Sequence, residues 1–249
     1  MKLYENILPE QVIGKTLDNY LAKGYYRMVQ SVFTTECIHG EHGNMLDCFW
    51  LRTLVNEINP INTHKIFIKN KKFSISIGEA KYNDEIDQLY ALYLENISFN
   101  APENVQNVLL NSEKKAAFDT KIIEIRDHET LIAVGYFDLG ENSIMGILNF
   151  YNPHYKKYSL GKLLILLKID YAQKNKFKYY YTGYIVLGCN NFDYKLFPSI
   201  DAIEVFIPEK NYTWERFNNL GKEGLKEFGF SYNILKELND IPFDDFNLP

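Results

Sequence analysis

The sequence predicts a mixed α/β protein of the α+β kind, and three observations support this fold class. Three consecutive segments rich in β-branched and aromatic residues are predicted strands joined by turns: 121–126, 131–138 and 143–151. An apolar helix is predicted over 159–175, and one more strand over 178–183. Because the meander leads into a strand–helix–strand crossover, the last strand is expected to lie parallel to its predecessor.

The first 80 residues predict a smaller, mixed N-terminal region. Apolar residues at helical spacing indicate a short helix over 16–23, which Gly24 is expected to end as a C-cap. Residues 34–48 contain His, Gly, Asn and two cysteines, and they are predicted to form a loop. Extended segments are predicted on both sides of this loop: 25–33, 49–55, 64–69 and 72–77.

Residues 81–249 are predicted to form the larger unit. Asn83-Asp84 is expected to cap a helix, and Pro102 to begin a short second one. The helix over 159–175 is apolar nearly all round its middle, so we expect it to be buried against the sheet. Two further elements precede an acidic tail: a strand at 203–207 and a helix near 221–228. A meander followed by a crossover resembles the order of elements in GNAT-type acyltransferases.

Composition limits the classes of partner. The 249 residues carry a net charge of −5, so no strong, non-specific binding to DNA is expected. Two groups of lysines indicate either a local basic patch or ordinary solvated surface: Lys65, Lys69, Lys71 and Lys72, and Lys156, Lys157, Lys162 and Lys168. The 19 tyrosines and 17 phenylalanines either reflect an AT-rich genome or form a stacking surface.

Membrane and secretory features are not expected. The segment Met1–Asn6 lacks the apolar core of a signal peptide, and the longest apolar run, Leu163–Leu167, is too short to span a bilayer. Three cysteines cannot all pair within one chain, so Cys37, Cys48 and Cys189 are expected to be reduced. These features predict a cytoplasmic protein without a membrane partner.

Four motifs follow one another between residues 150 and 197: Phe150-Tyr151-Asn152-Pro153, Ser159-Leu160-Gly161, Gly183-Tyr184-Ile185 and Tyr194-Lys195. In order and spacing they resemble the C-terminal domain of the aminoacyl-tRNA–protein transferases, the family of arginyl-tRNA–protein transferase and its bacterial leucyl relative. The run Leu21–Arg27 resembles, more loosely, the segment that precedes a cysteine cluster in that family. Asn152 stands where the family motif has aspartate, and the middle cysteines of the cluster are absent.

The resemblance implies an enzyme that moves arginine or leucine from tRNA to the N-terminal α-amine of proteins beginning with Asp or Glu, in the N-degron pathway of protein degradation. An aminoacyl ester is already activated, so positioning and oxyanion stabilisation are the main requirements. No cofactor is expected beyond aminoacyl-tRNA as co-substrate. The donor stays open: acidic walls, from Asp193 or Glu204, would suit arginine, and an apolar pocket would suit leucine.

The resemblance also implies roles for single residues. The catalytic candidates are Tyr151, Ser159, Gly161 and Lys195. The substrate-binding candidates are Arg27, Tyr158, Leu160, Gly183, Tyr184 and Tyr194. Arg27 suits bidentate pairing with an acceptor carboxylate, and Lys195 a point-charge contact. The tyrosines either stack on the terminal adenine of the tRNA or pack in the core. The segment Ser159–Gly161 either binds the tRNA terminus or caps the helix.

Other interpretations remain open. Cys37, His39, His42 and Cys48 form a mixed set of weak zinc candidates, but their spacing matches no standard zinc module and no metal is expected. A CoA-dependent N-acetyltransferase is one alternative, although Tyr158–Leu163 holds a single glycine where consecutive amides would wrap a pyrophosphate. A second alternative is an inactive relative that only binds tRNA or acidic N-termini.

Overall fold

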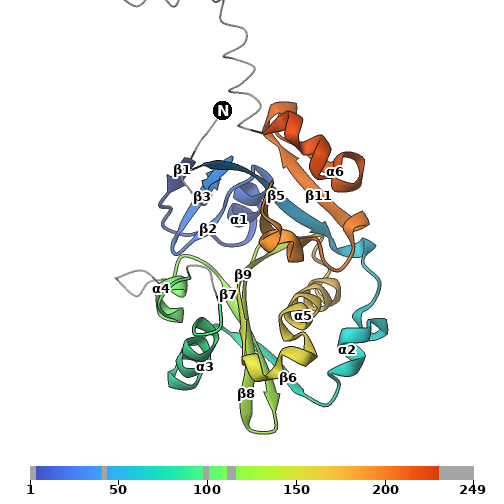
Figure 1. The fold of residues 1–249 in the computed structure, drawn as a ribbon. Coiled ribbons are helices and arrows are strands. Elements are labelled where there is room, and N and C mark those ends of the chain that lie inside the picture. Colours follow the sequence, from blue (N-terminus) through green and yellow to red (C-terminus); the bar gives the residue numbers. More distant parts are fainter. Residues whose placement is uncertain (1–3, 41–43, 98–100, 111–115, 230–249) are drawn as a thin grey trace, which may run out of the picture.

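A computed structural model describes residues 4–40, 44–97, 101–110 and 116–229, which form two sheets and their covering helices (Figure 1). The smaller sheet has the strand order β1-β3-β2. Its strands are β1 (Tyr4–Ile7), β2 (Tyr26–Met28) and β3 (Ser31–Thr35). The larger sheet contains β4 (Cys37–His39), β5 (Met45–Leu54), β6 (Ser74–Glu79), β7 (Thr120–Asp127), β8 (Thr130–Leu139), β9 (Ser143–Tyr151), β10 (Tyr179–Val186), β11 (Ile203–Ile207) and β12 (Thr213–Arg216).

The larger sheet confirms the predicted α+β class. Its order is β12-β11-β5-β10-β9-β8-β7-β6, with β4 paired to β5. Strands β7, β8 and β9 form the expected antiparallel meander. Strand β10 returns parallel to β9, in the register Tyr179↔Ser143 to Tyr181↔Met145. The helix between them is α5 (Leu160–Lys174), so the meander and crossover of a GNAT-like fold are both present.

Helices cover both faces of this sheet (Figure 1). On one face lie α5 and α2 (Lys65–Lys69), where Leu163, Leu164 and Ile169 are fully buried against strands β7 to β9. On the other lie α3 (Asp84–Leu94) and α4 (Val105–Leu109). The Asn83 side chain accepts a hydrogen bond from the Ile86 N–H, which confirms the predicted cap of α3. Burial of such apolar faces is the dominant stabilising contribution in this layered arrangement.

The predicted division at residue 80 falls inside one continuous sheet. Strand β5 lies between β10 and β11, with Arg52 opposite both Tyr181 and Glu204. Strand β6 pairs with β7. Helices α1 (Gly14–Ala22) and α6 (Phe217–Leu225) pack at the end of the molecule that holds β5 and β11 (Figure 1). Helix α6 begins four residues before the helix predicted near 221–228. Residues 1–80 thus supply three strands, β4, β5 and β6, to the sheet that was assigned to the larger unit.

Two local predictions were wrong. Residues 34–48 are not a loop throughout, because Cys37–His39 and Met45–Leu54 pair as β4 and β5. Residues 65–69 are a helix rather than a strand. The His64 side chain accepts a hydrogen bond from the Ile66 N–H at its start, and the buried Asn70 side chain donates to the Ile66 carbonyl at its end. These local polar contacts stabilise a helical turn that the apolar pattern alone did not indicate.

No helix in the described part of the chain is both long enough and apolar enough to cross a membrane. The acidic tail lies outside the described residues.

Candidate functional site

The candidate site forms where β9 and β10 part. Their parallel pairing ends at Met145 and Tyr181. Each strand then carries a bulge. Ile147 has no partner on β8, because Gly146 pairs with Phe137 and Leu148 with Tyr136, and Thr182 has no partner on β5. Bulges redirect a strand and interrupt its ladder, so the two strands open away from each other here.

A cavity of about 530 Å³ occupies this opening. Its lining comes from α3, β9, α5, β10 and the 3₁₀ segments Pro153–Tyr158 and Asn190–Leu196. Tyr90, Tyr93, Ala101, Gly146, Ile147, Leu148, Asn149, Tyr151, Lys156, Ser159, Gly161, Lys162, Ile165, Lys168, Tyr180, Thr182, Asn191, Tyr194 and Lys195 line it. Four of these side chains are lysines and none is acidic. The cavity therefore offers aromatic surface and positive charge together.

The start of α5 borders the cavity. Ser159 precedes the helix in the left-handed conformation (φ 55°) and makes no side-chain capping bond. The N–H groups of Leu160, Gly161 and Lys162 belong to the first turn and have no partner within the helix. A Cβ atom on Gly161 would lie 3.4 Å from Cε1 of Tyr151, so the Tyr151 ring packs closely on this helix start. Such a terminus, with its positive dipole end, favours an oxyanion or phosphate.

Lys168 lies on the cavity wall at the middle of α5 and is 1% exposed. Its Nζ donates to the Tyr136 carbonyl (2.7 Å) and to Oδ1 of Asn149 (2.8 Å). Burial lowers the pKa of Lys168 to about 7, and the charge of Asp138 opposes this shift only partly. Gly135 leaves room for the Asn149 side chain that binds Lys168, because a Cβ at position 135 would lie 2.8 Å from Oδ1 of Asn149.

Lys195 faces the cavity from the segment after β10. Its Nζ donates to the Tyr184 carbonyl (2.8 Å) and lies 4.7 Å from the Tyr184 ring and 4.8 Å from the Phe192 ring. Burial lowers the pKa of Lys195 to about 8. Gly183 has a φ of +99°, and a Cβ there would lie 3.0 Å from Nζ of Lys195. Glycine at this position permits both the turn of the strand and the close approach of the amine.

Tyr26 holds the point at which the strands separate. Its hydroxyl donates a hydrogen bond to the Gly146 carbonyl of β9 and lies 3.3 Å from the Tyr181 carbonyl of β10. Its ring stacks on Trp50 of β5, and burial raises the pKa of the phenol well above its usual value. A residue of the N-terminal region thus fixes the geometry of a cavity built mainly by the rest of the chain.

The structure brings five of the predicted site residues together at the cavity: Tyr151, Ser159, Gly161, Tyr194 and Lys195. The other candidates lie around it. Leu160 is fully buried in the core, and Tyr184 packs its ring against Trp50 and Phe192. Gly183 lies beneath Lys195, and Tyr158 sits outside the cavity with its hydroxyl accepting a hydrogen bond from Lys72.

Arg27 does not reach the cavity. Its guanidinium is buried and forms an ion pair with Asp138 (2.8 Å), donates to the Leu109 carbonyl (2.8 Å) and covers the Phe118 ring. Removing one partner of such a buried pair is strongly destabilising. This placement does not support contact between Arg27 and a substrate carboxylate; it makes Arg27 a link between β2 and β8.

Several cavity residues were not predicted from the sequence. Tyr90 and Tyr93 come from α3, and the Tyr93 ring lies 5.8 Å from that of Tyr151. Thr182 has a buried Oγ1 without a hydrogen-bond partner among the described residues. Lys168 had a usable signal, because a lysine within the apolar middle of a buried helix must place its amine at a polar site. The tyrosines and Thr182 carried no comparable signal.

The weak zinc candidates do not form a cluster within the described ranges. Cys37 and Cys48 are buried on β4 and β5, and no group of three or more His, Cys, Asp and Glu side chains there is arranged to hold a metal ion. His42 lies outside the described residues. The proposed acidic walls are also elsewhere: Asp193 pairs with Lys222, and Glu204 pairs with Arg52.

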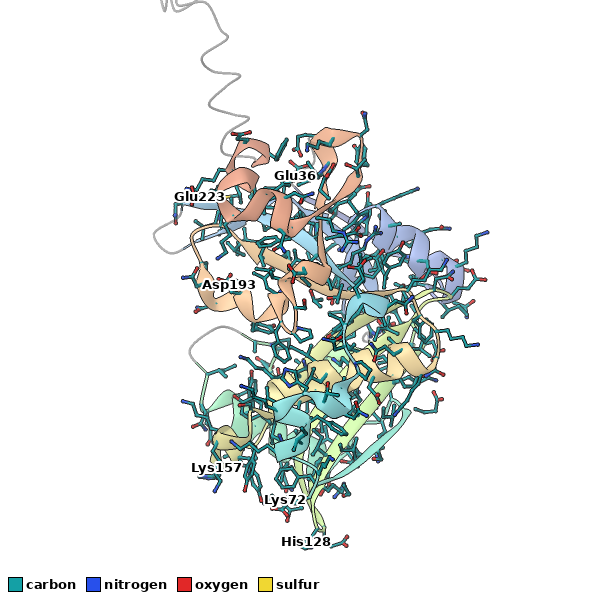
Figure 2. All side chains as sticks on the ribbon, turned by 90° about the vertical axis from the view of Figure 1, so that its right-hand side faces the viewer. Glu36, Lys72, His128, Lys157, Asp193 and Glu223 are labelled. Atoms are coloured by element: carbon teal, nitrogen blue, oxygen red, sulfur yellow. The ribbon has the colours of Figure 1, made fainter. Side chains whose placement is uncertain are left out.

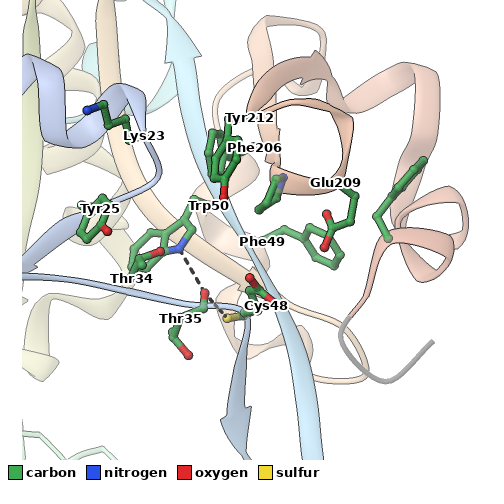
Figure 3. A pocket seen from close by; sticks show the side chains of 13 residues that line it. Lys23, Tyr25, Thr34, Thr35, Cys48, Phe49, Trp50, Phe206, Glu209 and Tyr212 are labelled. Carbon is green, nitrogen blue, oxygen red and sulfur yellow. Dashed lines mark hydrogen bonds between the residues drawn. The ribbon is translucent and has the colours of Figure 1, made fainter. Parts of the chain in front are cut away.

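A second cavity of about 430 Å³ lies between β3, β5 and β11 (Figure 3). Trp50 and Phe206 line it, and so do the carboxylates of Glu36 and Glu209. The Trp50 Nε1–H donates to the Thr35 carbonyl (3.2 Å) at its edge. None of the predicted catalytic or substrate-binding residues lines it, so the first cavity is the candidate site.

The meander, the crossover helix and the cavity between the parted strands define a GNAT-like acyltransferase fold. Residues 82–198 match the family model described as the C terminus of arginine-tRNA-protein transferase. An aspartate/glutamate leucyltransferase from Saccharophagus degradans is 27% identical over 84% of each chain. One from Teredinibacter turnerae is 26% identical over 75% of this chain and 77% of its own. Over most of its length, this chain is therefore similar to aminoacyl-tRNA–protein transferases.

More distant similarities were also found. Arginyl-tRNA–protein transferase 2 of Arabidopsis thaliana is 24% identical over 54% of this chain and 26% of its own. Among solved structures, L-PGS from Bacillus licheniformis has a TM-score of 0.42 at 13% identity and covers 87% of this chain and 61% of its own. A tandem GNAT protein from the clavulanic acid biosynthesis pathway has a TM-score of 0.37 at 10% identity, over 59% of this chain and 46% of its own.

Proposed function

We propose that this protein transfers leucine from its tRNA to the N-terminal α-amine of proteins that begin with Asp or Glu. The observation that carries the proposal is the cavity between β9 and β10 in a chain with this similarity. It combines a helix start, the buried Lys168, the half-buried Lys195 and an apolar wall. We place the reaction in the cytoplasm, where charged tRNA is available, and in the marking of proteins for degradation. Aminoacyl-tRNA is the co-substrate, and no cofactor is needed.

In this mechanism the acceptor amine attacks the carbonyl carbon of the aminoacyl ester. A C–N bond forms, the ester C–O bond breaks, and the ribose hydroxyl of the tRNA leaves with a proton. The free N–H groups at the start of α5 and the charge of Lys195 stabilise the negative charge that develops on the carbonyl oxygen. Lys168 accepts the proton that the incoming ammonium must lose before it can attack.

Leucine is favoured over arginine as the donor residue because of the charge of the lining. An arginine guanidinium would need a carboxylate partner, and the described lining contains none. Lys156, Lys162, Lys168 and Lys195 would instead repel it. Ile147, Leu148, Ile165 and the tyrosine rings provide apolar surface for a leucine side chain. The two bacterial relatives named above are leucyltransferases by name, whereas the more distant one from Arabidopsis thaliana is an arginyltransferase by name.

The lysines also favour an acidic acceptor. An Asp or Glu at the first position carries a carboxylate that pairs with an ammonium, and Lys156 and Lys162 stand at the same wall as the start of α5. A basic first residue would meet like charge. We therefore expect acceptor discrimination to be electrostatic and to weaken at high salt.

The test is transfer of labelled amino acids from a total pool of charged tRNA to peptides that differ only in their first residue. We expect leucine label on Asp- and Glu-initiated peptides, and none on matched Lys- or Ala-initiated peptides. Lys195→Met should reduce the rate about tenfold or more. Absence of label on every peptide, or acetylation of the same peptides from acetyl-CoA, would refute the proposal.

A further inference from the structure

We propose that six lysines beside the cavity form a docking surface for the phosphate backbone of the tRNA acceptor arm. This inference rests on the proposed function and deepens it. The lysine face consists of Lys65, Lys69, Lys72, Lys156, Lys157 and Lys162, from α2, the turn before β6, the 3₁₀ segment Pro153–Tyr158 and the first turn of α5.

The fold joins two groups of lysines that are far apart in the sequence. Lys69 Nζ donates to the Lys157 carbonyl, and Lys72 Nζ donates to the Tyr158 hydroxyl (2.9 Å). The buried side chain of Asn70 donates to the Tyr158 carbonyl (3.0 Å), which fixes α2 to the segment before α5. Lys72 and Lys157 accordingly lie near each other at one end of the molecule (Figure 2).

Tyr158 is the centre of one half of this face. The Nζ atoms of Lys72, Lys157 and Lys69 lie 4.7, 5.2 and 5.7 Å from its ring centroid. The hydrogen bond from Lys72 lowers the pKa of the phenol, with the charge of Lys157 adding to the effect. Three ammonium groups around one ring repel one another, and an anion placed among them relieves that repulsion.

His64 lies in the other half of the lysine face, near Lys65 and Lys162. Partial burial and then the charges of Lys65 and Lys162 lower the pKa of the imidazole. Its ring packs edge-on against Phe197, over which Lys162 Nζ lies at 5.3 Å. The imidazole therefore tends to be neutral, and the positive charge here comes from the two lysines.

The charges of the lysine face are not neutralised by carboxylates. Within the described ranges none of the six forms an ion pair, whereas lysines elsewhere do: Lys81, Lys121, Lys174, Lys210, Lys222 and Lys226. Asp127, which raises the pKa of Lys72, accepts a hydrogen bond from the Tyr155 hydroxyl (3.0 Å). Of the labelled acids, Glu36 and Glu223 lie at the opposite end, and Asp193 lies about midway (Figure 2). Lysines without carboxylate partners can attract a polyanion locally, even on a chain whose net charge is negative.

The lysine face is continuous with the cavity, and this continuity favours RNA as the anion that binds to the face. Lys156 and Lys162 belong to the lysine face and also line the cavity. A strand whose phosphates lie on the face therefore has its terminal nucleotide at the cavity, where the ester must be placed. A half-buried tyrosine beside lysines, such as Tyr158, is also a combination that binds single-stranded nucleic acid, by stacking and by phosphate contacts.

The test uses K69A/K72A/K157A, because none of these three side chains lines the cavity. The matched control is K174A/K210A/K226A, three solvent-exposed lysines outside the face. Binding of uncharged tRNA is measured against salt concentration. We expect the face variant to bind at least tenfold more weakly at about 0.1 M salt, and its salt slope to fall by about 2. The control should keep the affinity and slope of the unsubstituted protein.

Kinetics supply a second readout. The face variant should raise KM for leucyl-tRNA with kcat unchanged, and should use leucyl-adenosine, which lacks the phosphates, as well as the unsubstituted protein does. Equal tRNA affinity and slope in the face and control variants would overturn this inference while leaving the proposed function intact. Salt-dependent tRNA binding that the face variant loses, without any transfer activity, would refute the proposed function and leave the docking surface standing.

Discussion

At the scale of single residues, the hydrogen bonds of Lys168 define its protonation state. Both of its partners, the Tyr136 carbonyl and Oδ1 of Asn149, are acceptors. A neutral amine has two N–H groups and one lone pair, so these two bonds use both donors and leave the lone pair free. A charged ammonium would keep a third donor in an apolar surrounding, which burial disfavours. The free lone pair is what a proton acceptor requires.

We predict that Lys168→Met lowers kcat about a hundredfold and removes the rise of kcat/KM through pH 7. General-base catalysis contributes roughly 10²–10⁴-fold to a rate, and the group titrates at a pKa of about 7. Methionine keeps most of the volume and apolar contact of the side chain. The control is Lys174→Met, an exposed lysine at the end of the same helix. An unchanged pH profile in Lys168→Met would exclude the assigned role.

We predict that Gly183→Ala destabilises the protein by about 1–3 kcal/mol, because its φ of +99° is costly for any residue with a Cβ. The new methyl group would also lie 3.0 Å from Nζ of Lys195 and displace it. Activity should therefore fall more than the loss of folded protein explains. Urea unfolding and kcat/KM on an Asp-initiated peptide measure the two effects. Gly78→Ala, with no atom within 4 Å of its added Cβ, should change neither.

At the scale of elements, the separation of β9 and β10 depends on a residue from β2. We predict that Tyr26→Phe costs about 1 kcal/mol of unfolding free energy, because the partly buried Gly146 carbonyl loses its hydrogen bond. The substitution also weakens the contact that fixes the point where β9 and β10 separate, so kcat/KM should fall. The strands of the sheet far from the cavity should keep their structure. Urea unfolding and peptide transfer check this. Tyr20→Phe is the control, and equal stability of the two variants would count against the assigned role of Tyr26.

The sequence predicted the single strands and helices better than it predicted which strands pair with one another. Strands β7 to β9 and helix α5 have local signatures, because alternation and helical spacing follow from burial of one face. The position of β5 between β10 and β11 has none, since pairing partners 125 to 154 residues apart leave no mark in either segment. The helix at 65–69 was missed because contacts made by His64 and Asn70 override its apolar pattern.

At the scale of the whole molecule, the site residues also divide into those that the sequence predicted and those that only tertiary packing brings to the cavity. Tyr151, Ser159, Gly161, Tyr194 and Lys195 were predicted because they belong to motifs, and motifs are contiguous in sequence. Tyr90 and Tyr93 were missed because they reach the cavity only when α3 packs on the sheet. The lysine face arises in the same way. Its two groups of lysines, at 65–72 and 156–162, are separated by about 85 positions in the sequence, and tertiary contacts such as the hydrogen bond from Asn70 to the Tyr158 carbonyl join them.

The whole molecule should become more stable as pH rises above 7, and Lys168 should account for part of that gain. Burial holds its pKa at about 7 in the folded state, against 10.5 in an unfolded chain. Between these values the unfolded state binds more protons, so the unfolding free energy rises with pH, by at most about 1.4 kcal/mol per unit for one group. Below pH 7 both states carry the proton and this dependence ends.

We predict that Lys168→Met flattens the increase in unfolding free energy between pH 7 and 9.5, a range that stays below the titration of ordinary tyrosines. Urea unfolding at half-unit steps of pH measures the slope for the unsubstituted protein, for Lys168→Met and for Lys174→Met, whose exposed amine should leave the slope unchanged. Because Lys195 also has a lowered pKa, part of the slope should remain, but a slope in Lys168→Met as steep as that of the unsubstituted protein would mean that the Lys168 amine is protonated in the folded state at neutral pH. In that case it could not accept a proton from the acceptor amine.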